Sequence, residues 1–548
     1  MPLLLDLPPE LILRCLHFLA LDDIAACLRV NVLLAQTISG SLDIQYRAEL
    51  ELAGVEENVR VLSRLSIAER LEALRAREDR WRAITPLSRR IIPFPYSYGS
   101  FFYDLTTDYW FLAGMETADG TTASKVEYVD LLLGDYAPDW KVAYGGSADS
   151  ECMNFFVSLE ELDLLVIVTR HNCVDDPSAL SIDAHLLSFS TGEPHPHATS
   201  PKIHITRYDS AAVVDTNPAA AGSILAVTCL DMMAPADPAT NKLFVFNWQT
   251  GLPLLPPRYT TTAAVVFLTP EILITPSADH NLLEIHRFSL EDPAVPTALV
   301  EFRLPTLAYR THVDPSRMQC RASPEPVRGV FSPAKQRGNF FSAPTNRLII
   351  LSYDTISDAH ADRGWDEDSR TETHVFAIPS ERLLARVRAA FDAHVESVPW
   401  REWGRACTRA LDSAQTARAW VIASSGQRLV AFPPCAMGTA QPETHHIRLL
   451  DFNPRQVREA RRRTGITTPE SETTRVIEAD ADEADGADIE HANFAEKLTS
   501  DIAYVEYTSS QTFSYHNVYM SDSCILGMIY AEDSDPQTVD QLEVLLFG

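Results

Sequence analysis

The sequence contains no uninterrupted apolar stretch approaching the ~18 residues that a membrane-spanning helix requires. Its nine cysteines are scattered, with no CxxC pair and no spacing typical of a disulfide framework or a zinc site. No asparagine lies in an N-x-[ST] acceptor, and the start, Met-Pro-Leu-Leu-Leu-Asp, lacks the basic region of a secretory signal. These absences predict a soluble, unsecreted protein of the cytoplasm or the nucleus.

Basic residues are scarce relative to acidic ones. The chain has 46 Lys and Arg against 75 Asp and Glu, which gives a formal net charge of -29. A field of this sign repels phosphate backbones and anionic lipid headgroups. We therefore expect neither nucleic acid nor a membrane surface as a partner.

Enzyme motifs are also missing: GxSxG, HExxH, GxxxxGK[ST], GxGxxG and the EF-hand loop do not occur. His195-Pro196-His197 and His445-His446 fall in predicted loops without a Cys or carboxylate at ligand spacing, so we interpret them as solvated histidines. Asp175-Asp176 and Asp366-Glu367-Asp368 do not continue into the oxygen-rich loop that calcium needs. We therefore expect no catalytic residue, no metal and no cofactor.

The first ninety residues carry helical periodicity. Pro8 and Pro9 suit a first helical turn, and the apolar spacing that follows predicts a helix from Pro8 to Leu19. Asp22 and Asp23 are expected as the cap and first-turn acids of a second helix, and residues 32–38 form a third. Two further helices are predicted at 42–51 and 66–81, the latter with a capping box and with charged residues opposite its apolar face.

Beyond residue 91 the pattern changes to short apolar strands broken by turn residues. Three segments, 127–134, 186–192 and 243–251, share a strand followed by a polar turn of the Asx, Thr-Gly or Pro kind. Less regular copies are 283–288, 373–379 and 447–454, and a seventh apolar strand is 541–547. Apolar runs at 164–168, 223–227, 272–274 and 348–351 are expected to be the buried inner strands. Repeated short strands with protected edges are typical of a propeller, and a terminal strand completing the first blade would close the ring.

The fold class that we predict is α+β and multidomain. A small three-helix unit is expected over residues 1–45 and a helical connector over 46–90. Residues 91–548 are expected to form a large all-β domain, a seven-bladed β-propeller with irregular insertions. The first two repeats start 59 residues apart, which exceeds the ~40–45 of compact blades, so long insertions are required.

Three insertions stand out, and we expect all of them to be loops from one rim. Residues 380–394 predict an amphipathic helix, followed by Trp400 and Trp403, and residues 312–338 are rich in proline and charge. The third carries the cluster Arg455–Arg463 and then an acidic run. This cluster could hold an acidic or phosphorylated target segment. Pairing with the acidic run is the favoured alternative, because the two meet at high effective concentration.

Residues 7–34 resemble the F-box family. The segment has LPxE as Leu7-Pro8-Pro9-Glu10, then aliphatic residues, a helix ending in Leu, a short hydrophobic-Asp turn and an aliphatic stretch ending in Val. The pattern Ser-x-Ala-Glu-Arg-Leu that begins at Ser66 is similar to the connector of many fungal F-box proteins. The resemblance covers about a tenth of the chain, and it implies a module that docks its carrier onto the adaptor of a ubiquitin-protein ligase.

Three helices in forty residues cannot hide all of these aliphatic side chains internally, and each one removed from water contributes ~1.5–3 kcal/mol. Ten residues are expected to bind the adaptor: Leu7, Pro8, Glu10, Leu11, Ile12, Leu16, Leu19, Leu21, Ile24 and Val30. The implied function is a substrate-receptor subunit of an SCF-type ligase, without catalysis of its own. Its expected partners are a Skp-type adaptor, cullin through that adaptor, and an unidentified target protein bound by the propeller.

Two other functions stay open at this point. The chain could be a protein-interaction scaffold that carries an F-box outside any ligase, or its leading helices could simply cap the propeller. It could also be a propeller enzyme, which would require carboxylates and histidines converging in the central channel, and no motif predicts such a cluster.

Overall fold

The structure is a computed structural model. It describes residues 7–94, 101–106, 108–114, 125–132, 139–146, 150–159, 161–173, 175–234, 237, 240–289, 297–326, 338–343, 346–357, 370–414, 416, 423–433, 435, 442–464, 473–480, 493–531 and 539–548. Among them, no helix has both the length and the apolar character needed to cross a membrane. None of the nine cysteines is in a disulfide.

Helices make up the N-terminal part, as predicted. They are α1 Pro9–Leu16, α2 Leu21–Cys27, α3 Val32–Ser39, α4 Leu42–Ala53, α5 Val59–Leu62 and α6 Ile67–Ala83. The capping box of α6 is confirmed, because Ser66 accepts from the Glu69 amide while the Glu69 side chain accepts from Ser66. The first helix ends at Leu16, three residues earlier than expected, and Ala20 rather than Asp22 precedes α2.

Two apolar cores divide these helices. The first core joins α1, α2, α3 and the start of α4 through Ile12, Leu16, Ile24, Leu34, Ile38 and Ile44. The second joins the rest of α4 to α6 and reaches Phe340 of the β domain. The boundary expected at residue 45 therefore falls inside α4, and the one expected at residue 90 falls inside strand β2 (Ser88–Pro93). The helix α4 is shared by both cores, so the two units are packed together.

Seven sheets, antiparallel apart from one parallel strand pair in the fourth, form the β domain within the described residues, and they are the blades of a β-propeller. The first three blades are β3 Phe101–Leu105, β4 Tyr109–Gly114, β5 Val126–Asp130 and β6 Lys141–Tyr144; then β7 Glu151–Ser158, β8 Leu164–Asn172, β9 Ala179–Ser188 and β10 Lys202–Asp209; then β11 Val214–Ala221, β12 Ile224–Asp231, β13 Lys242–Asn247, β14 Leu252–Pro253 and β15 Arg258–Tyr259.

The next three blades contain added strands and helices. They are β16 Val266–Thr269, β17 Ile272–Ser277, β18 Leu282–Arg287, β19 Ala298–Arg303 and β25 Ser397–Val398; then β20 Thr311–Val313, β21 Gln319–Ala322, β23 Leu348–Ser357, β24 Arg370–Pro379 and β26 Arg409–Leu411; then β27 Ser424–Ser425, β28 Arg428–Ala431, β29 His445–Asp451, β31 Tyr504–Phe513 and β30 Thr474–Ile477.

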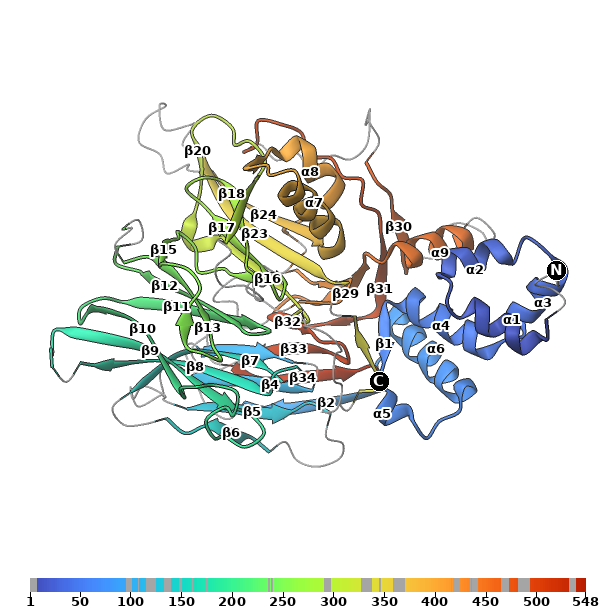
Figure 1. Cartoon of the computed structure of the whole chain (residues 1–548), viewed down its shortest axis with the longest axis horizontal. Helices are drawn as coiled ribbons and strands as arrows, with labels where there is room; N and C mark the ends of the chain where they lie inside the picture. Colours follow the sequence, from blue (N-terminus) through green and yellow to red (C-terminus); the bar gives the residue numbers. More distant parts are fainter. Residues whose placement is uncertain are drawn as a thin grey trace.

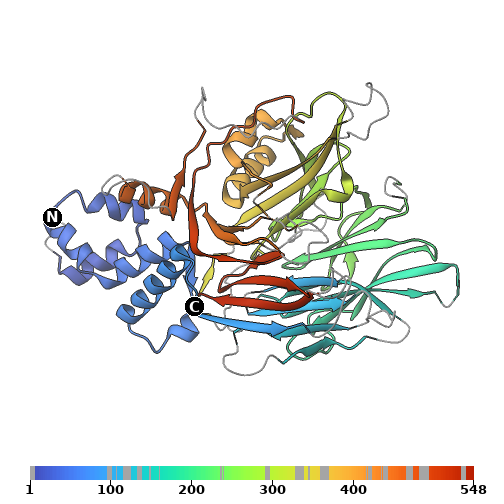
Figure 2. The same ribbon diagram turned by 180° about the vertical axis from the view of Figure 1, so that it is seen from behind.

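The seventh blade closes the ring by joining the two ends of the β domain. Its strands are β32 Asn517–Met520, β33 Cys524–Tyr530, β34 Val539–Leu546 and, outermost, β2. Strand β2 pairs antiparallel with β34, from Ser88 opposite Leu546 to Pro93 opposite Gln541. A terminal strand was expected to close the ring by completing the first blade. Instead β2, at the N-terminal end of the β domain, completes the last blade (Figures 1 and 2).

All seven predicted repeats lie on the third strand of a blade: β5, β9, β13, β18, β24, β29 and β34. The four apolar runs expected to be inner strands are buried as predicted, but they are the second strands β8, β12, β17 and β23. The innermost strands are a separate set that the pattern did not indicate. They face the channel between the blades, and their side chains are partly polar.

The insertions differ from the loops on one rim that the sequence suggested. Residues 380–394 contain the predicted helix, α7 Ser380–Asp392, and Trp400 and Trp403 lie buried in α8 Trp400–Cys407. Part of the proline-rich region forms β20 and β21 of the fifth blade, while 327–337 lie outside the described residues. The arginine cluster is a helix, α9 Pro454–Thr464, and it lies beside the N-terminal helices, apart from α7 and α8 (Figures 1 and 2).

Candidate functional site

Large apolar side chains are exposed on the first three helices. Of the eighteen that are exposed among the described residues, six fall between residues 11 and 33. These six, called the apolar surface below, are Leu11, Phe18, Leu28, Val30, Val32 and Leu33. Phe18 is 83% exposed, and Val30 and Val32 are each 73% exposed. Such a concentration is typical of a site that another molecule covers.

A shallow groove runs along the junction of α2 and α3. It has a volume of about 430 Å³ and is lined by residues 28–32 together with Ala35, Gln36 and Ser39. Asn31 fixes this junction, because its side chain accepts a hydrogen bond from the Leu33 amide at 2.7 Å. This N-cap has extended backbone angles, so Asn31 separates the end of α2 from the start of α3. The groove therefore has a defined shape with apolar edges.

The ten residues predicted to bind an adaptor divide into three groups in the structure. Pro8, Glu10, Leu11 and Val30 are exposed, Leu7, Leu19 and Leu21 are half-buried, and Ile12, Leu16 and Ile24 lie in the first apolar core. The last three hold the helices together and contribute almost no exposed area. A binding surface on this unit therefore consists of the first group, with the edges of the second.

Sequence reasoning missed four members of the apolar surface: Phe18, Leu28, Val32 and Leu33. Helical periodicity gave no reason to separate these side chains from the core, since the segments are short. A signal was present for Phe18, because it follows the last residues of α1 and falls between His17 and the next turn.

Helix α4 connects the three leading helices to the rest of the protein. The Arg47 guanidinium donates hydrogen bonds to the carbonyl oxygens of His17 and Leu19 at 2.9 and 2.8 Å. These bonds fix the turn between α1 and α2. At the other end, the Leu52 carbonyl accepts from Asn453 and Gln456 of the sixth blade, each at 2.9 Å. The apolar surface is therefore held at a fixed position relative to the propeller.

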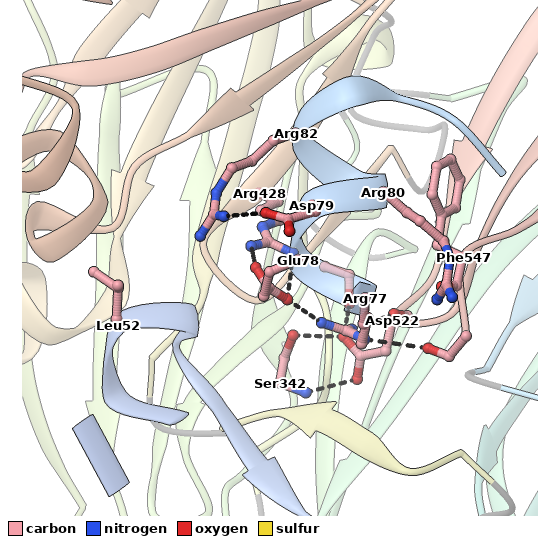
Figure 3. Close-up of polar contacts among 12 residues, drawn as sticks. Leu52, Arg77, Glu78, Asp79, Arg80, Arg82, Ser342, Arg428, Asp522 and Phe547 are labelled. Carbon is pink, nitrogen blue, oxygen red and sulfur yellow. Dashed lines mark hydrogen bonds and ion pairs between the residues drawn. The ribbon is translucent and has the colours of Figure 1, made fainter. Parts of the chain in front are cut away.

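A buried charge network joins α6 to the propeller (Figure 3). Glu78 forms ion pairs with Arg77 on its own helix and with Arg428 on β28, and Arg428 also pairs with Asp451 at 3.0 Å. Arg77 and Glu78 are each only 3% exposed. The sequence placed charged residues opposite the apolar face of α6 but gave no sign of their burial, because Arg428 meets them from a distant part of the chain.

Burial and pairing act in opposite directions on these groups. Burial alone would raise the pKa of Glu78, but the guanidiniums of Arg428 and Arg77 together hold the pKa of that carboxyl below its ordinary value. For Asp451 burial prevails, and its pKa is raised in spite of Arg428. Arg428 carries two carboxylate partners, which raise its pKa although burial opposes them. The network is thus a structural element with compensated charge.

Aromatic packing reinforces the same junction. The Trp81 ring stacks on Phe547 at a centroid distance of 4.0 Å, and both side chains are buried. Arg77 also donates to the carbonyl oxygens of Asp522, at 2.7 Å, and Gly548, at 3.2 Å. In addition, β1 Val55–Glu57 pairs with β22 Phe340–Ser342 of the β domain. Helix α6 and β1 thereby attach the helical unit beside the seam where the ring closes.

The arginine cluster of α9 serves this attachment too. Arg461 pairs with Glu478 in the acidic segment that follows, as the self-pairing alternative predicted. Arg455 pairs with Glu51 of α4 at 2.7 Å, and Arg458 approaches Asp22 of α2 at 3.9 Å. Residues 481–490 of the acidic run lie outside the described residues. Two of these arginines therefore face the helical unit.

Several of the histidines and aspartates that the sequence offered as possible metal ligands contact protein groups in the structure. His195 is buried against Trp248 at a ring distance of 4.8 Å, and its Nε2 lies 2.8 Å from the Leu162 carbonyl oxygen, so the interpretation as a solvated histidine was wrong. The His446 ring lies 2.7 Å from the Ser509 carbonyl oxygen. Asp176 caps the turn at Ser178, and Asp366-Glu367-Asp368 lie outside the described residues. Within the described part of the chain, no three His, Cys, Asp or Glu side chains are grouped as for a metal ion.

No family model matches the chain, and no curated protein matches its sequence. Solved structures give weak likenesses. Sqt1 from Chaetomium thermophilum is 11% identical, with a TM-score of 0.27 over 81% of this chain and 82% of that one. AztD from Citrobacter koseri is 8% identical, with a TM-score of 0.26 over 64% of this chain and 79% of that one. The complex of KlAtg21 with the coiled-coil of AgAtg16 is 10% identical, with a TM-score of 0.24 over 50% of this chain and 77% of that one. Likenesses this weak carry no argument about the fold. The propeller is established by the strand pairing of this chain alone.

Proposed function

We propose that this chain is a substrate-receptor subunit of an SCF-type ubiquitin ligase, with an F-box in its first helices. The observation that carries the proposal is the apolar surface, which lies on the segment whose residue pattern resembles the F-box. The pattern supplies the kind of partner, a Skp-type adaptor, and the exposed side chains supply a surface for it. The target protein is assigned to the propeller, whose rim offers the loops that carry specificity.

Energetics favour a covered rather than a bare surface. Full burial of a Val, Leu or Phe side chain contributes about 1.5–3 kcal/mol. The six side chains of the apolar surface are 39–83% exposed, so covering each of them would contribute part of that free energy against the cost of association. The first apolar core already gives the unit its own interior, so these side chains are not needed for folding. Their exposure is consistent with a protein partner.

Rigid attachment also suits a receptor. A ligase must present its target at a set distance from the ubiquitin-charged enzyme, because transfer depends on proximity and orientation. The α6 network, the Trp81 stack and the α9 pairs all fix the helical unit against the sixth and seventh blades. A flexible tether would bind the adaptor equally well without this geometry.

We expect the double variant Phe18→Asp with Val30→Asp to lose adaptor binding. Each carboxylate would be buried against apolar groups of the partner, and losses at central interface positions reach about 2–4 kcal/mol each. The purified full chain is immobilised, and recovery of a Skp-type adaptor and cullin is measured for the variant and the unaltered chain. Val142→Asp is the matched control, since Val142 on β6 is 56% exposed and far from the helices.

Three outcomes separate the alternatives. Loss of adaptor in the double variant, with full recovery in Val142→Asp, supports the F-box. Failure of the unaltered chain to recover any adaptor would contradict it. Recovery of the adaptor without cullin, or with no proteasome-dependent rise of any protein when the chain is deleted, would indicate a scaffold outside a ligase.

A further inference from the structure

A cavity lies at the centre of the propeller, where the seven blades meet. Its volume is about 150 Å³, and it is lined by residues on or next to the first strand of every blade. The lining consists of residues 103–106, 154–158, 161, 217–219, 265–266, 320–325, 342, 350, 424–425 and 521–522. No histidine is among these lining residues. Apolar walls come from Leu105, Phe156 and Val157.

The charges on this lining are unbalanced. Four carboxylates, Asp104, Glu161, Glu325 and Asp522, face one guanidinium, that of Arg321, among the lining residues. The Asp522 carboxylate is satisfied, because it accepts from the Ser342 amide at 2.9 Å and from the hydroxyls of two serines. The cavity therefore has an excess of negative charge concentrated near Asp104 and Glu325.

Glu325 has an incomplete set of partners. Its Oε2 is buried and has no hydrogen-bond partner in the described part of the chain, and the Arg347 Nη1 lies 3.8 Å away. Arg347 is itself engaged, since its guanidinium donates to the carbonyl oxygens of Pro324 and Phe267. About a third of the Glu325 side chain, 32%, stays exposed although the residue lies at the centre of the protein. That exposed part faces the cavity.

Burial is the main influence on the protonation of these carboxyls. The pKa of Glu325 is raised to about 7, chiefly by burial, with Asp104 adding to the rise and Arg347 and Arg321 opposing it. Burial also raises the pKa of Asp104, which Arg321 and two backbone amides oppose. Both groups would be stabilised in their ionised form by a positive charge inside the cavity.

We infer that this cavity binds an organic cation, a primary ammonium or a guanidinium, beside Asp104 and Glu325, with its alkyl chain against Leu105, Phe156 and Val157. Such a cation reaches the cavity either as a free amine or as a lysine or arginine side chain of a bound protein. The inference does not depend on the helical unit, so it stands or falls separately from the ligase function.

Calorimetry on the full chain tests this inference. The probes are n-butylammonium, a short blocked peptide with one lysine, and the same peptide with glutamine in its place. We expect Glu325→Gln and Asp104→Asn each to weaken binding about tenfold, the usual value of one charge-assisted hydrogen bond. Glu271→Gln, in the exposed β16–β17 turn, is the control and should leave binding unchanged.

The pH dependence has a defined sign. The cation binds the ionised form of Glu325, so affinity should rise about tenfold between pH 6 and pH 8, as that carboxyl loses its proton around pH 7. In Glu325→Gln this rise should disappear. A binding affinity that is flat with pH in the unaltered chain would contradict the assignment of Glu325.

Each outcome decides the inference. Binding of n-butylammonium and of the lysine peptide indicates a site for free amines. Binding of the lysine peptide alone indicates a site for a side chain of a bound protein. Either result supports the inference when Glu325→Gln also loses affinity. Absence of binding by either cation at millimolar concentration, or equal binding by the glutamine peptide, would overturn it. If Glu325→Gln changes the unfolding midpoint of the protein, the affinity of Asp104→Asn is used to judge the inference in its place. The Phe18→Asp, Val30→Asp variant should bind the cation normally.

Discussion

Arg428→Ala is expected to lower the free energy of unfolding by about 3–5 kcal/mol, the usual cost of removing one partner from a buried ion pair. The substitution would leave Glu78 and Asp451 buried, at 3% and 2% exposure, without the guanidinium that both contact. Denaturant unfolding followed by fluorescence measures the change. Limited proteolysis between the helical unit and the propeller should accelerate as well, because α6 loses its polar anchor.

Arg462→Ala is the matched control for this change. Arg462 pairs with Glu459 on the outer face of α9, where its side chain is 72% exposed. Exposed ion pairs contribute about 0–1 kcal/mol, so this variant should unfold close to the unaltered chain. Equal unfolding free energies for the two variants would show that the network does not hold the helical unit in place.

Ile92→Asn is expected to destabilise the propeller by about 2.5–6 kcal/mol, because it weakens the strand that closes the ring. Ile92 is completely buried on β2, opposite Leu542 of β34, in a core shared by the first and seventh blades. The substitution removes about 1.5–3 kcal/mol of apolar burial and leaves an amide without partners, which costs about 1–3 kcal/mol more. Denaturant unfolding and the thermal midpoint measure the loss.

Ile91→Asn provides the comparison within the same strand. Ile91 points to the other face of β2 and is 56% exposed, opposite Glu543. An uncharged amide avoids a new repulsion with that carboxylate. We expect a change within about 0.5 kcal/mol. If both variants were equally stable, the closure of the ring by β2 would be contradicted.

Much of the propeller was predictable from the sequence because its signals are local. Third strands such as β13 join a run of apolar residues to a turn such as Asn247-Trp248-Gln249-Thr250-Gly251, and an apolar third strand recurs in every blade. The helix α6 was equally clear from its capping box. The innermost strands gave no such signal, because β27 has only two residues and these strands line a partly polar cavity.

The candidate sites depended more on tertiary contacts. Leu11 and Ile12 are neighbours of the same chemical type, yet Leu11 is 46% exposed and Ile12 is 1% exposed, because only Ile12 faces the core of the three helices. Likewise, Arg77 and Glu78 have the composition of a solvated helix face. Their burial follows from Arg428, which lies 350 residues away from Glu78.

The sequence by itself determined the order of elements, namely short helices, a capped connecting helix and seven repeated strands, since turns, caps and apolar periodicity act between residues a few positions apart. The tertiary structure decided which apolar side chains stay at the surface, which charges are buried, and which carboxylates meet at the centre of the ring. Those properties arise from packing between distant segments, and no local pattern encodes them.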